Sequence, residues 1–465
     1  MDQKKITLHV ISPENDLLRV TTFGAQALAE STIKTYEEFQ INRAYLKSKT
    51  SEILGLLRRA AAGGYSSGDT RFLDQMKELG GDLYRELIPA SLRAKLDEAA
   101  GGGLCLSIEG NMVNIPWELL YDGIGFFCRR YHLGRIVSIP PSARKAQKKQ
   151  ISNPVTFLSV SDPEGNLPGA FREGLGVRDL VLDLDVSAVP VFLAKHVKVS
   201  DLLEGLRRCD VLHFAGHVEG EGKETSLCLA DGRCSAARIE QFAGRHPFPL
   251  LVMLNGCSSS RSSSKSFSLE EGHARAFDLA SSFLLSGARH FVGTLWDVRD
   301  VVAAQAGVAF FRGLLSGMSV GAALWNVREE LAGTFGEPSM LWAGYLLYGD
   351  PGVTIGIGSR MADRFIKEMG QAESRIETYL QALGSTEARE RFVAACALHQ
   401  LGRSEGRSVL DQDFQVLIDL LESPSLLNRR QGILILQVLD IPDGGYRADG
   451  DPEARAAAIE VIGRR

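Results

Sequence analysis

The sequence lacks any apolar run of about 18 residues, the length that a membrane-spanning helix requires. It also lacks a secretory segment, because its first residues are charged and then strand-like. Positive and negative charges nearly balance, and the net charge is −5 over 465 residues. So small a net charge argues against nucleic-acid binding driven by bulk electrostatics. Together these absences predict a cytoplasmic protein that binds neither a membrane nor, directly, a nucleic acid.

Paired cysteines are missing as well, since none of the seven stands in a Cys-x-x-Cys spacing. An odd, scattered set argues against a disulfide framework and against a structural zinc site, and it favours a reducing compartment. The apolar neighbours of Cys105, Cys209 and Cys228 predict that these side chains are small buried hydrophobic groups.

What is present is the composition of an ordinary globular protein, with 45% hydrophobic and 23% charged residues. The length allows two to four domains. We predict an N-terminal subdomain over residues 1–150, a second subdomain over residues 151–358, and a helical part over residues 360–465. The basic, proline-containing stretch Pro140–Asn153 has no apolar periodicity and is interpreted as a linker.

Apolar strands alternate with helices from Pro154 onward, a pattern that predicts an α/β fold with parallel strands and right-handed crossovers. Near-continuous apolar strands are typical of a sheet that is covered on both faces. The predicted strands are Val155–Val160, Val211–Phe214, Pro249–Leu254 and His290–Leu295. The predicted helices are Ser200–Arg208, Ser235–Ala243, Glu271–Leu285, Val301–Leu315 and Val320–Leu331.

The first 150 residues mix both element types. Strands are predicted at Ile6–Ile11 and Leu104–Ile108. Amphipathic helices are predicted near Tyr36–Arg59 and Asp69–Leu87, and a short helix within Asn114–Gly123 is entered through proline and closed by glycine.

Helix-forming residues dominate after Ile357. Three segments there share a cap or a proline, an early arginine and then an apolar stripe, and they are Ser385–Ala395, Ser423–Gln431 and Asp451–Ile459. They resemble HEAT-type helical repeats, which stack into a solenoid. The spacing between the segments is uneven.

Two strand ends carry the residues most capable of chemistry. His217 follows the strand Val211–Phe214, and Cys257 follows the strand Pro249–Leu254. Because sites in open α/β sheets lie at the carboxyl ends of the strands, a thiol and an imidazole there are a candidate nucleophile and base. The backbone N–H groups of Cys257 and Val218 are candidate donors to an oxyanion.

Two other interpretations of these residues stay open. Cys257 can be a buried cysteine and His217 a satisfied core histidine. His213 and His217 stand four residues apart, which suggests a zinc site, but the intervening residues are strand-like and the required glutamate is absent. We therefore expect no metal and no cofactor.

Six segments resemble the motifs of CHAT-domain proteases, relatives of caspases and separase. They occur in the family's order over about residues 100–355 and are His213–His217, Leu254–Ser259, Ile115–Leu120, Phe267–Gly272, Gly287–Trp296 and Leu347–Pro351. The resemblance implies a caspase-like parallel sheet, with a pseudo-caspase half before the active half. It also implies that His217 and Cys257 are catalytic and that His213 is structural. The sequence departs from the family at Val218, where a glycine is usual.

The resemblance to separase-like relatives further implies an acidic group that selects a basic residue before the cleaved bond. Asp297 is the first candidate and Asp300 the second. Alternatively, both are solvated loop acids, or Asp297 caps the helix that begins at Val301. The serine-rich stretch Ser258–Ser268 is predicted to be a mobile loop, in which Arg261 and Lys265 are candidate self-cleavage sites.

The sequence therefore predicts a cysteine endopeptidase that cleaves protein substrates after a basic residue. We expect regulation through the helical repeats or a protein partner bound to them, and, by analogy alone, a role in bacterial defence. Two alternatives remain: a catalytically inactive CHAT scaffold that acts by protein binding, and a thiol-dependent acyltransferase or transpeptidase.

Overall fold

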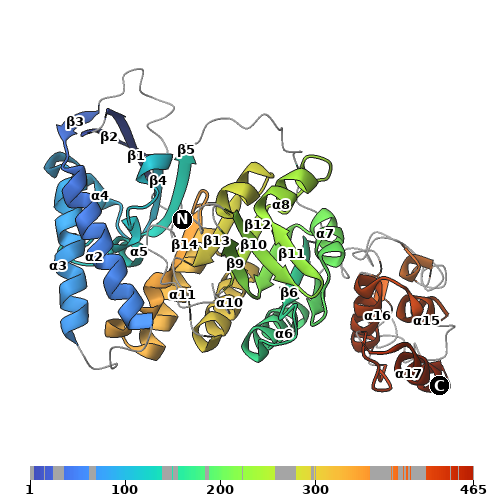
Figure 1. The fold of residues 1–465 in the computed structure, drawn as a ribbon. Coiled ribbons are helices and arrows are strands. Elements are labelled where there is room, and N and C mark those ends of the chain that lie inside the picture. Colours follow the sequence, from blue (N-terminus) through green and yellow to red (C-terminus); the bar gives the residue numbers. More distant parts are fainter. Residues whose placement is uncertain are drawn as a thin grey trace.

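A computed structural model gives the fold of most of the chain (Figure 1). It describes residues 5–14, 16–24, 36–61, 70–138, 149, 155–183, 188–221, 224–256, 279–294, 298, 300–356, 379, 381–385, 391, 394–395, 398, 415–439, 441–448 and 450–463.

An eleven-stranded sheet runs through the first two parts, in the order β3-β2-β1-β4-β5-β14-β13-β12-β8-β6-β7. Most neighbours are parallel; β2 with β1 and β3, and β13 with β14, are antiparallel. Its strands are β1 Lys5–Glu14, β2 Leu17–Gly24, β3 Glu37–Gln40, β4 Gly103–Glu109, β5 His132–Ser138, β6 Val155–Ser161, β7 Ala188–Ala194, β8 Val211–Ala215, β12 Leu251–Asn255, β13 His290–Thr294 and β14 Tyr345–Tyr348. The predicted α/β class with a largely parallel sheet is confirmed.

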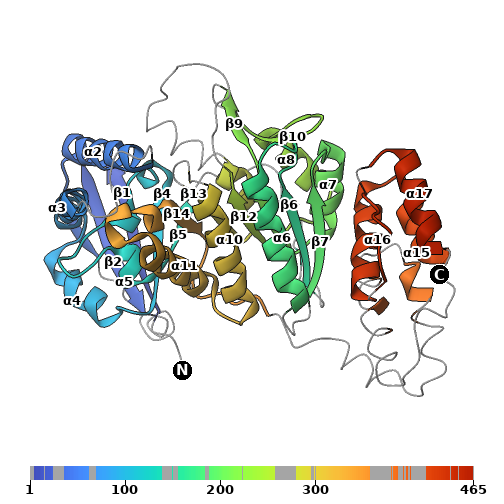
Figure 2. The ribbon, with the colours of Figure 1, turned by 90° about the horizontal axis from the view of Figure 1, so that it is seen from below.

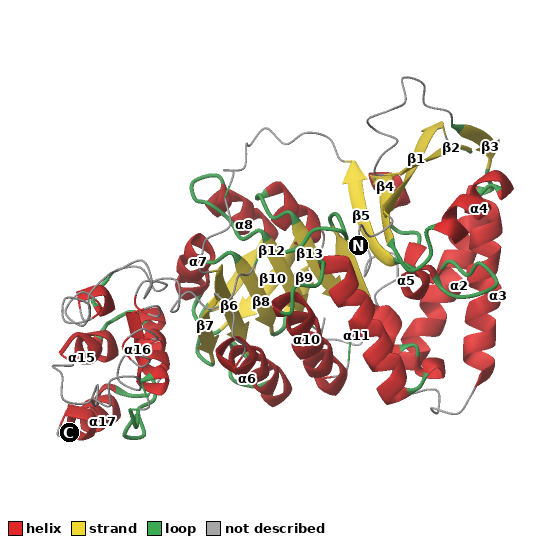
Figure 3. Ribbon diagram, turned by 180° about the vertical axis from the view of Figure 1, so that it is seen from behind, coloured by secondary structure: helices red, strands yellow, loops and turns green. Residues whose placement is uncertain are grey.

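Helices cover both faces of this sheet. In Figure 3, α6 Pro168–Asp183, α10 Asp300–Leu315 and α11 Val320–Phe335 lie side by side along one face, and α7 Val199–Arg208 and α8 Ala236–Ala243 lie on the other. Every residue of β6, β7, β8 and β12 is buried. Their largely apolar sequences follow from this double coverage. A small sheet beside the main one contains β9 Val218–Glu221, β10 Glu224–Leu229 and β11 Gly232–Ser235.

The N-terminal part corrects two expected helices. The helix predicted from Tyr36 begins only at Arg43, because Glu37–Gln40 form β3, whose alternating exposure suits a strand paired with β2. The short helix expected within Asn114–Gly123 is one 3-10 turn, Trp117–Leu119. The remaining helices here are α2 Arg43–Ala61, α3 Thr70–Leu87, α4 Ala90–Glu98 and α5 Phe127–Arg130.

A buried ion pair explains the motif Ile115–Leu120. Arg135 on β5 donates to both carboxylate oxygens of Glu118 and to the carbonyls of Val113 and Ile115. Burial alone would raise the pKa of Glu118, but the Arg135 guanidinium outweighs that effect and holds it below its usual value. The motif is therefore structural.

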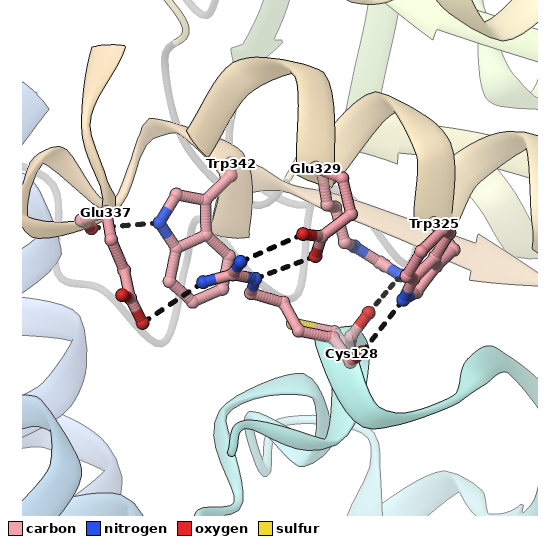
Figure 4. A network of polar contacts seen from close by, with 7 residues as sticks. Cys128, Trp325, Glu329, Glu337 and Trp342 are labelled. Carbon is pink, nitrogen blue, oxygen red and sulfur yellow. Dashed lines mark hydrogen bonds and ion pairs between the residues drawn. The ribbon is translucent and has the colours of Figure 1, made fainter. Parts of the chain in front are cut away.

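The two predicted subdomains share one sheet and one hydrophobic core. Strand β14 lies between β5 of the first part and β13 of the second. Arg129 on α5 also makes two hydrogen bonds to Glu329 on α11, at 2.8 and 2.9 Å, and an ion pair with Glu337 (Figure 4). Trp325 donates to the backbone oxygen of Arg129 at 2.8 Å. These contacts hold the boundary between the parts together.

The C-terminal helices lie at one end of the molecule in Figure 2, and they have a hydrophobic core of their own. They are α15 Gln415–Glu422, α16 Leu426–Val438 and α17 Pro452–Gly463. Helix α16 lies against edge strand β7, where Leu434 packs on Val189 and Arg430 donates to the backbone oxygen of Ala194 at 2.9 Å. No helix among the described residues is both long enough and apolar enough to cross a membrane.

Candidate active site

The strands that precede His217 and Cys257 are neighbours in the sheet. Strands β8 and β12 are parallel, and Ala215 is paired with Asn255 at their carboxyl ends. Each strand is followed by a glycine, and the next residue is His217 on one side and Cys257 on the other. A Cβ added at Gly256 would overlap Val218 Cγ2 and lie 3.1 Å from the Gly216 oxygen. The two strand ends therefore touch, and only glycine fits at position 256.

His217 is buried, and its ring is held from the loop that follows β6. Its Nε2 lies 3.1 Å from the side-chain oxygen of Asn166. In the tautomer in which the Nε2–H group donates a hydrogen bond to this oxygen, Nδ1 is the ring nitrogen that can accept a proton.

The loop that carries Asn166 is itself tightly bonded. Asp162 has a left-handed backbone, with φ of 50°, and its N–H donates to the Ala215 oxygen at 2.8 Å. Its carboxylate accepts from the Leu167 N–H at 2.7 Å, and its backbone oxygen accepts from the Lys195 N–H at 3.0 Å. Asn166 is thus fixed relative to the end of β8.

Val218 begins β9 and pairs with Leu227 on β10. The Cys228 N–H donates to the His217 oxygen at 3.0 Å. Because hydrogen-bonded and non-bonded pairs alternate in an antiparallel ladder, the N–H of Val218 points away from β10. That orientation suits the oxyanion donor expected from the sequence.

A buried polar network lies beneath the two strand ends. Glu173 on α6 accepts from His213 Nε2 at 2.8 Å and from Asn255 Nδ2 at 2.6 Å. The other ring nitrogen of His213 lies 2.9 Å from Ser159 Oγ. Both nitrogens of His213 thus have protein partners, in line with the structural role that the family resemblance implies.

A cavity of about 100 Å³ opens beside His217. It is lined by Leu167, Ala170, Glu173, Gly216, His217, Asn255, Asp300 and Ala303. Asp300 is exposed at the first turn of α10. A Cβ added at Gly169 would lie 2.7 Å from Asp300 Cβ, so this glycine lets the aspartate approach α6. Asp300 and His217 therefore face one cavity.

The five cysteines among the described residues are all buried, including Cys105, Cys209 and Cys228 as predicted. Burial raises the thiol pKa to about 11 in Cys105 and Cys234, and to about 12 in Cys128, Cys209 and Cys228. These thiols stay protonated near neutral pH and are poor nucleophiles. Cys257, Asp297, Arg261 and Lys265 lie outside the described residues.

Sequence reasoning missed three residues of this site: Asn166, Glu173 and Asn255. Asn255 stood directly before Gly256-Cys257 at a strand end, which was a usable signal. Asn166 and Glu173 come from a loop and a helix about 90 and 84 residues before Cys257. Nothing in the spacing of these two linked them to the strand ends.

The model of the CHAT domain family matches residues 77–350 of the chain. No curated protein matches the chain in sequence. Among solved structures, the chain is similar to separase in the separase–securin complex of Saccharomyces cerevisiae. The two share 13% sequence identity with a TM-score of 0.47, and the match covers 75% of this chain and 30% of the separase chain. It is also similar to the Arg-specific cysteine proteinase gingipain R, with 9% identity and a TM-score of 0.38, over 68% of this chain and 77% of that one. The chain thus spans less than a third of the length of separase.

Proposed function

The chain belongs to the CHAT-domain family, and on that premise we propose that it is a caspase-like cysteine endopeptidase with Cys257 as nucleophile and His217 as base. The observation that carries the proposal is the register of β8 and β12, which brings the residues before His217 and Cys257 side by side. The bond from His217 Nε2 to Asn166 adds to it, because it leaves Nδ1 as the proton acceptor.

The reaction follows from these roles. His217 takes the proton of the Cys257 thiol, and the thiolate attacks the peptide carbonyl carbon to form a carbon–sulfur bond. The N–H groups of Val218 and Cys257 receive the oxyanion, each donor contributing about 3 kcal/mol to the transition state. The imidazolium then protonates the leaving amine. Water, activated by the same imidazole, hydrolyses the thioester and restores the free thiol.

We propose a basic residue before the cleaved bond, because the exposed carboxylate of Asp300 lines the cavity beside His217. Asp297 remains the first candidate from sequence. Replacing Asp297 or Asp300 by asparagine should slow cleavage after arginine or lysine by about 30-fold or more, since a desolvated charge pair contributes on the order of 2–5 kcal/mol. Initial rates on matched peptides ending in arginine or leucine measure this. An equal loss on both peptides would mark the aspartate as structural.

An inactive CHAT scaffold is the second candidate function, favoured by the separate core of the C-terminal helices, which can bind a partner without catalysis. A peptide electrophile ending in arginine distinguishes the two. The endopeptidase should be labelled once, at Cys257, and Cys257→Ala and His217→Ala should escape labelling. A scaffold would show no labelling above that of the Cys257→Ala protein. Labelling followed by peptide ligation instead of hydrolysis would identify a transpeptidase.

We further propose that the C-terminal helices are HEAT-like repeats that regulate the site or bind a protein partner. Two arginines support the repeat: Arg391 donates to the Ser385 oxygen at 2.6 Å and Arg429 to the Ser423 oxygen at 2.7 Å. Each bond spans six residues in the chain. Equivalent bonds in two segments are what a repeated unit produces.

A series of hydrogen bonds connects α16 to the candidate active site. The Arg430 side chain donates to the backbone oxygen of Ala194, and the N–H of the next residue, Lys195, donates to the backbone oxygen of Asp162 in the loop that carries Asn166. We expect Arg430→Ala to lower kcat on a short peptide by about three- to tenfold, since each bond in this series contributes about 1 kcal/mol. Steady-state kinetics measure the change, with Arg455→Ala on α17 as control.

An unchanged kcat in folded Arg430→Ala protein, and in a protein truncated at Gly358, would leave the helices as a docking arm for substrate or partner. Peptide rates and circular dichroism on the same preparations decide between the two. By analogy with the family alone, we place this peptidase in bacterial defence; loss of protection in cells that carry Cys257→Ala would test that role.

A further inference from the structure

Glu173 is a buried carboxylate whose position the proposed reaction does not explain. It stands on α6, is 2% exposed, and its Oε1 accepts hydrogen bonds from two different strands. One donor is His213 on β8, which stands four residues before His217. The other is Asn255 on β12, which stands two residues before Cys257. One oxygen thus joins the strand of the proposed base to that of the proposed nucleophile.

Asn255 is held from three directions. Its Nδ2 donates to Glu173 at 2.6 Å and to the Ala303 oxygen on α10 at 2.9 Å. Its Oδ1 accepts from the Tyr345 hydroxyl on β14 at 2.9 Å. An amide bonded through both of its ends has one orientation, so the last residue of β12 cannot shift without breaking bonds to Glu173, α10 and β14.

Glycines on α6 and α10 provide the space for the Glu173 carboxylate and its network. A Cβ added at Gly307 on α10 would overlap Glu173 Oε1, and one added at Gly174 would overlap Ser161 Oγ. Ser161 lies 3.1 Å from Ser159, the second partner of His213. Two helices therefore approach the network closely enough that only glycine fits at these points.

Burying a carboxylate is costly, and an apolar side chain of similar size packs at lower cost. A role in stability alone is thus a weak reason for a glutamate at this position. Its two hydrogen bonds instead fix the relative position of β8 and β12 near their carboxyl ends, just before His217 and Cys257.

We propose that Glu173 is a positioning residue that holds the strand ends of His217 and Cys257 in register for proton transfer, which rests on the endopeptidase function proposed above. It acts through His213 and Asn255. Glu173→Gln keeps the size of the side chain and one accepting oxygen, but it removes the negative charge that strengthens the hydrogen bonds from both donors. The link between the two strands is then weakened.

Two measurements test this on the full chain. Glu173→Gln should lower kcat about 10- to 100-fold with KM within about twofold, on arginine and neutral peptides alike, because a misplacement near 1 Å costs about that much. The pH profile of Cys257 alkylation by iodoacetamide, read by mass spectrometry of its tryptic peptide, should shift by about one pH unit or more toward that of His217→Ala. The five buried thiols, with pKa values of about 11 to 12, do not react in this range.

Glu118→Gln is the matched control, because it makes the same change at another buried, doubly bonded carboxylate in the N-terminal part. It should lower Tm and leave the alkylation profile unchanged. If Glu173→Gln does not fold, Asn255→Ser breaks the same link from the other strand and should give the same shift.

Wild-type kcat and alkylation profile in folded Glu173→Gln protein would overturn the proposal. A loss confined to arginine peptides would also overturn it, since Glu173 would then act as an acidic group of the substrate pocket. Failure of the endopeptidase function itself is recognised separately, by wild-type protein that neither cleaves the peptides nor is labelled at Cys257.

Discussion

Alanine at position 257 or at position 217 should abolish peptide cleavage, by about 10³-fold or more, and the double variant should be no worse than either single one. The nucleophile and its base act as one unit, so removing either leaves the other without a function. The hydrogen bond between His217 Nε2 and Asn166 supports the proposed role of His217 as base, because a proton on Nε2 leaves Nδ1 as the acceptor. Rates on a fluorogenic peptide ending in arginine measure the loss.

Cys234→Ala and His290→Gln are the controls for this experiment. Cys234 is a buried thiol whose pKa burial raises to about 11. His290 is a buried histidine 3.1 Å from the Asp350 oxygen, and burial lowers its pKa. Both variants should keep wild-type turnover. Substantial turnover by Cys257→Ala in a preparation free of contaminating protease would show that another group is the nucleophile.

Gly256→Ala should reduce kcat about 100-fold while leaving the fold intact. The new methyl group would overlap Val218 Cγ2, so the two strand ends must move apart, and overpacking of this kind costs about 1–3 kcal/mol. The displaced residues directly precede the nucleophile and follow the base, where about 1 Å decides a factor of 10². Peptide kinetics and thermal unfolding of the same protein separate the effects on rate and on stability.

A second substitution provides a direct check of that contact. Val218→Gly removes the overlapping atoms, so Gly256→Ala/Val218→Gly should regain at least tenfold of the lost kcat. Gly333→Ala on α11, where an added Cβ meets nothing within 4 Å, is the matched control and should be silent. If the double variant recovers nothing, the loss at position 256 comes from a cause other than contact between the strand ends.

Six of the eleven strands of the central sheet were predicted, because a strand buried on both faces is mostly an apolar run, but β7 was missed although all of its residues are buried. Val211–Ala215 and Leu251–Asn255 were found within one or two residues of their bounds. The placement of His217 and Cys257 after these strands needed only the rule that sites lie at the carboxyl ends of parallel strands. The assignment of the catalytic roles themselves stays a prediction.

The parts that were not predicted depend on pairing between distant residues. Glu37–Gln40 looks helical by composition and forms a strand only because β2 is there to pair with it. Strand β14 enters the sheet antiparallel to β13, some 50 residues later in the chain, which alternation of strands and helices does not indicate. Glu173 and Asn166 belong to the site only because α6 and its preceding loop pack across the ends of β8 and β12. Such contacts override local propensity and leave no periodic signal.

Trapping of the covalent intermediate tests directly whether Cys257 is the nucleophile. Wild-type protein is mixed with an arginine ester or peptide, quenched in acid within milliseconds to seconds, and digested for mass spectrometry. We predict the mass of one acyl group on the peptide that contains Cys257, and no such mass in the Cys257→Ala protein. Turnover of the same substrate with no acyl group on that peptide, or with the acyl group on another residue, would contradict it.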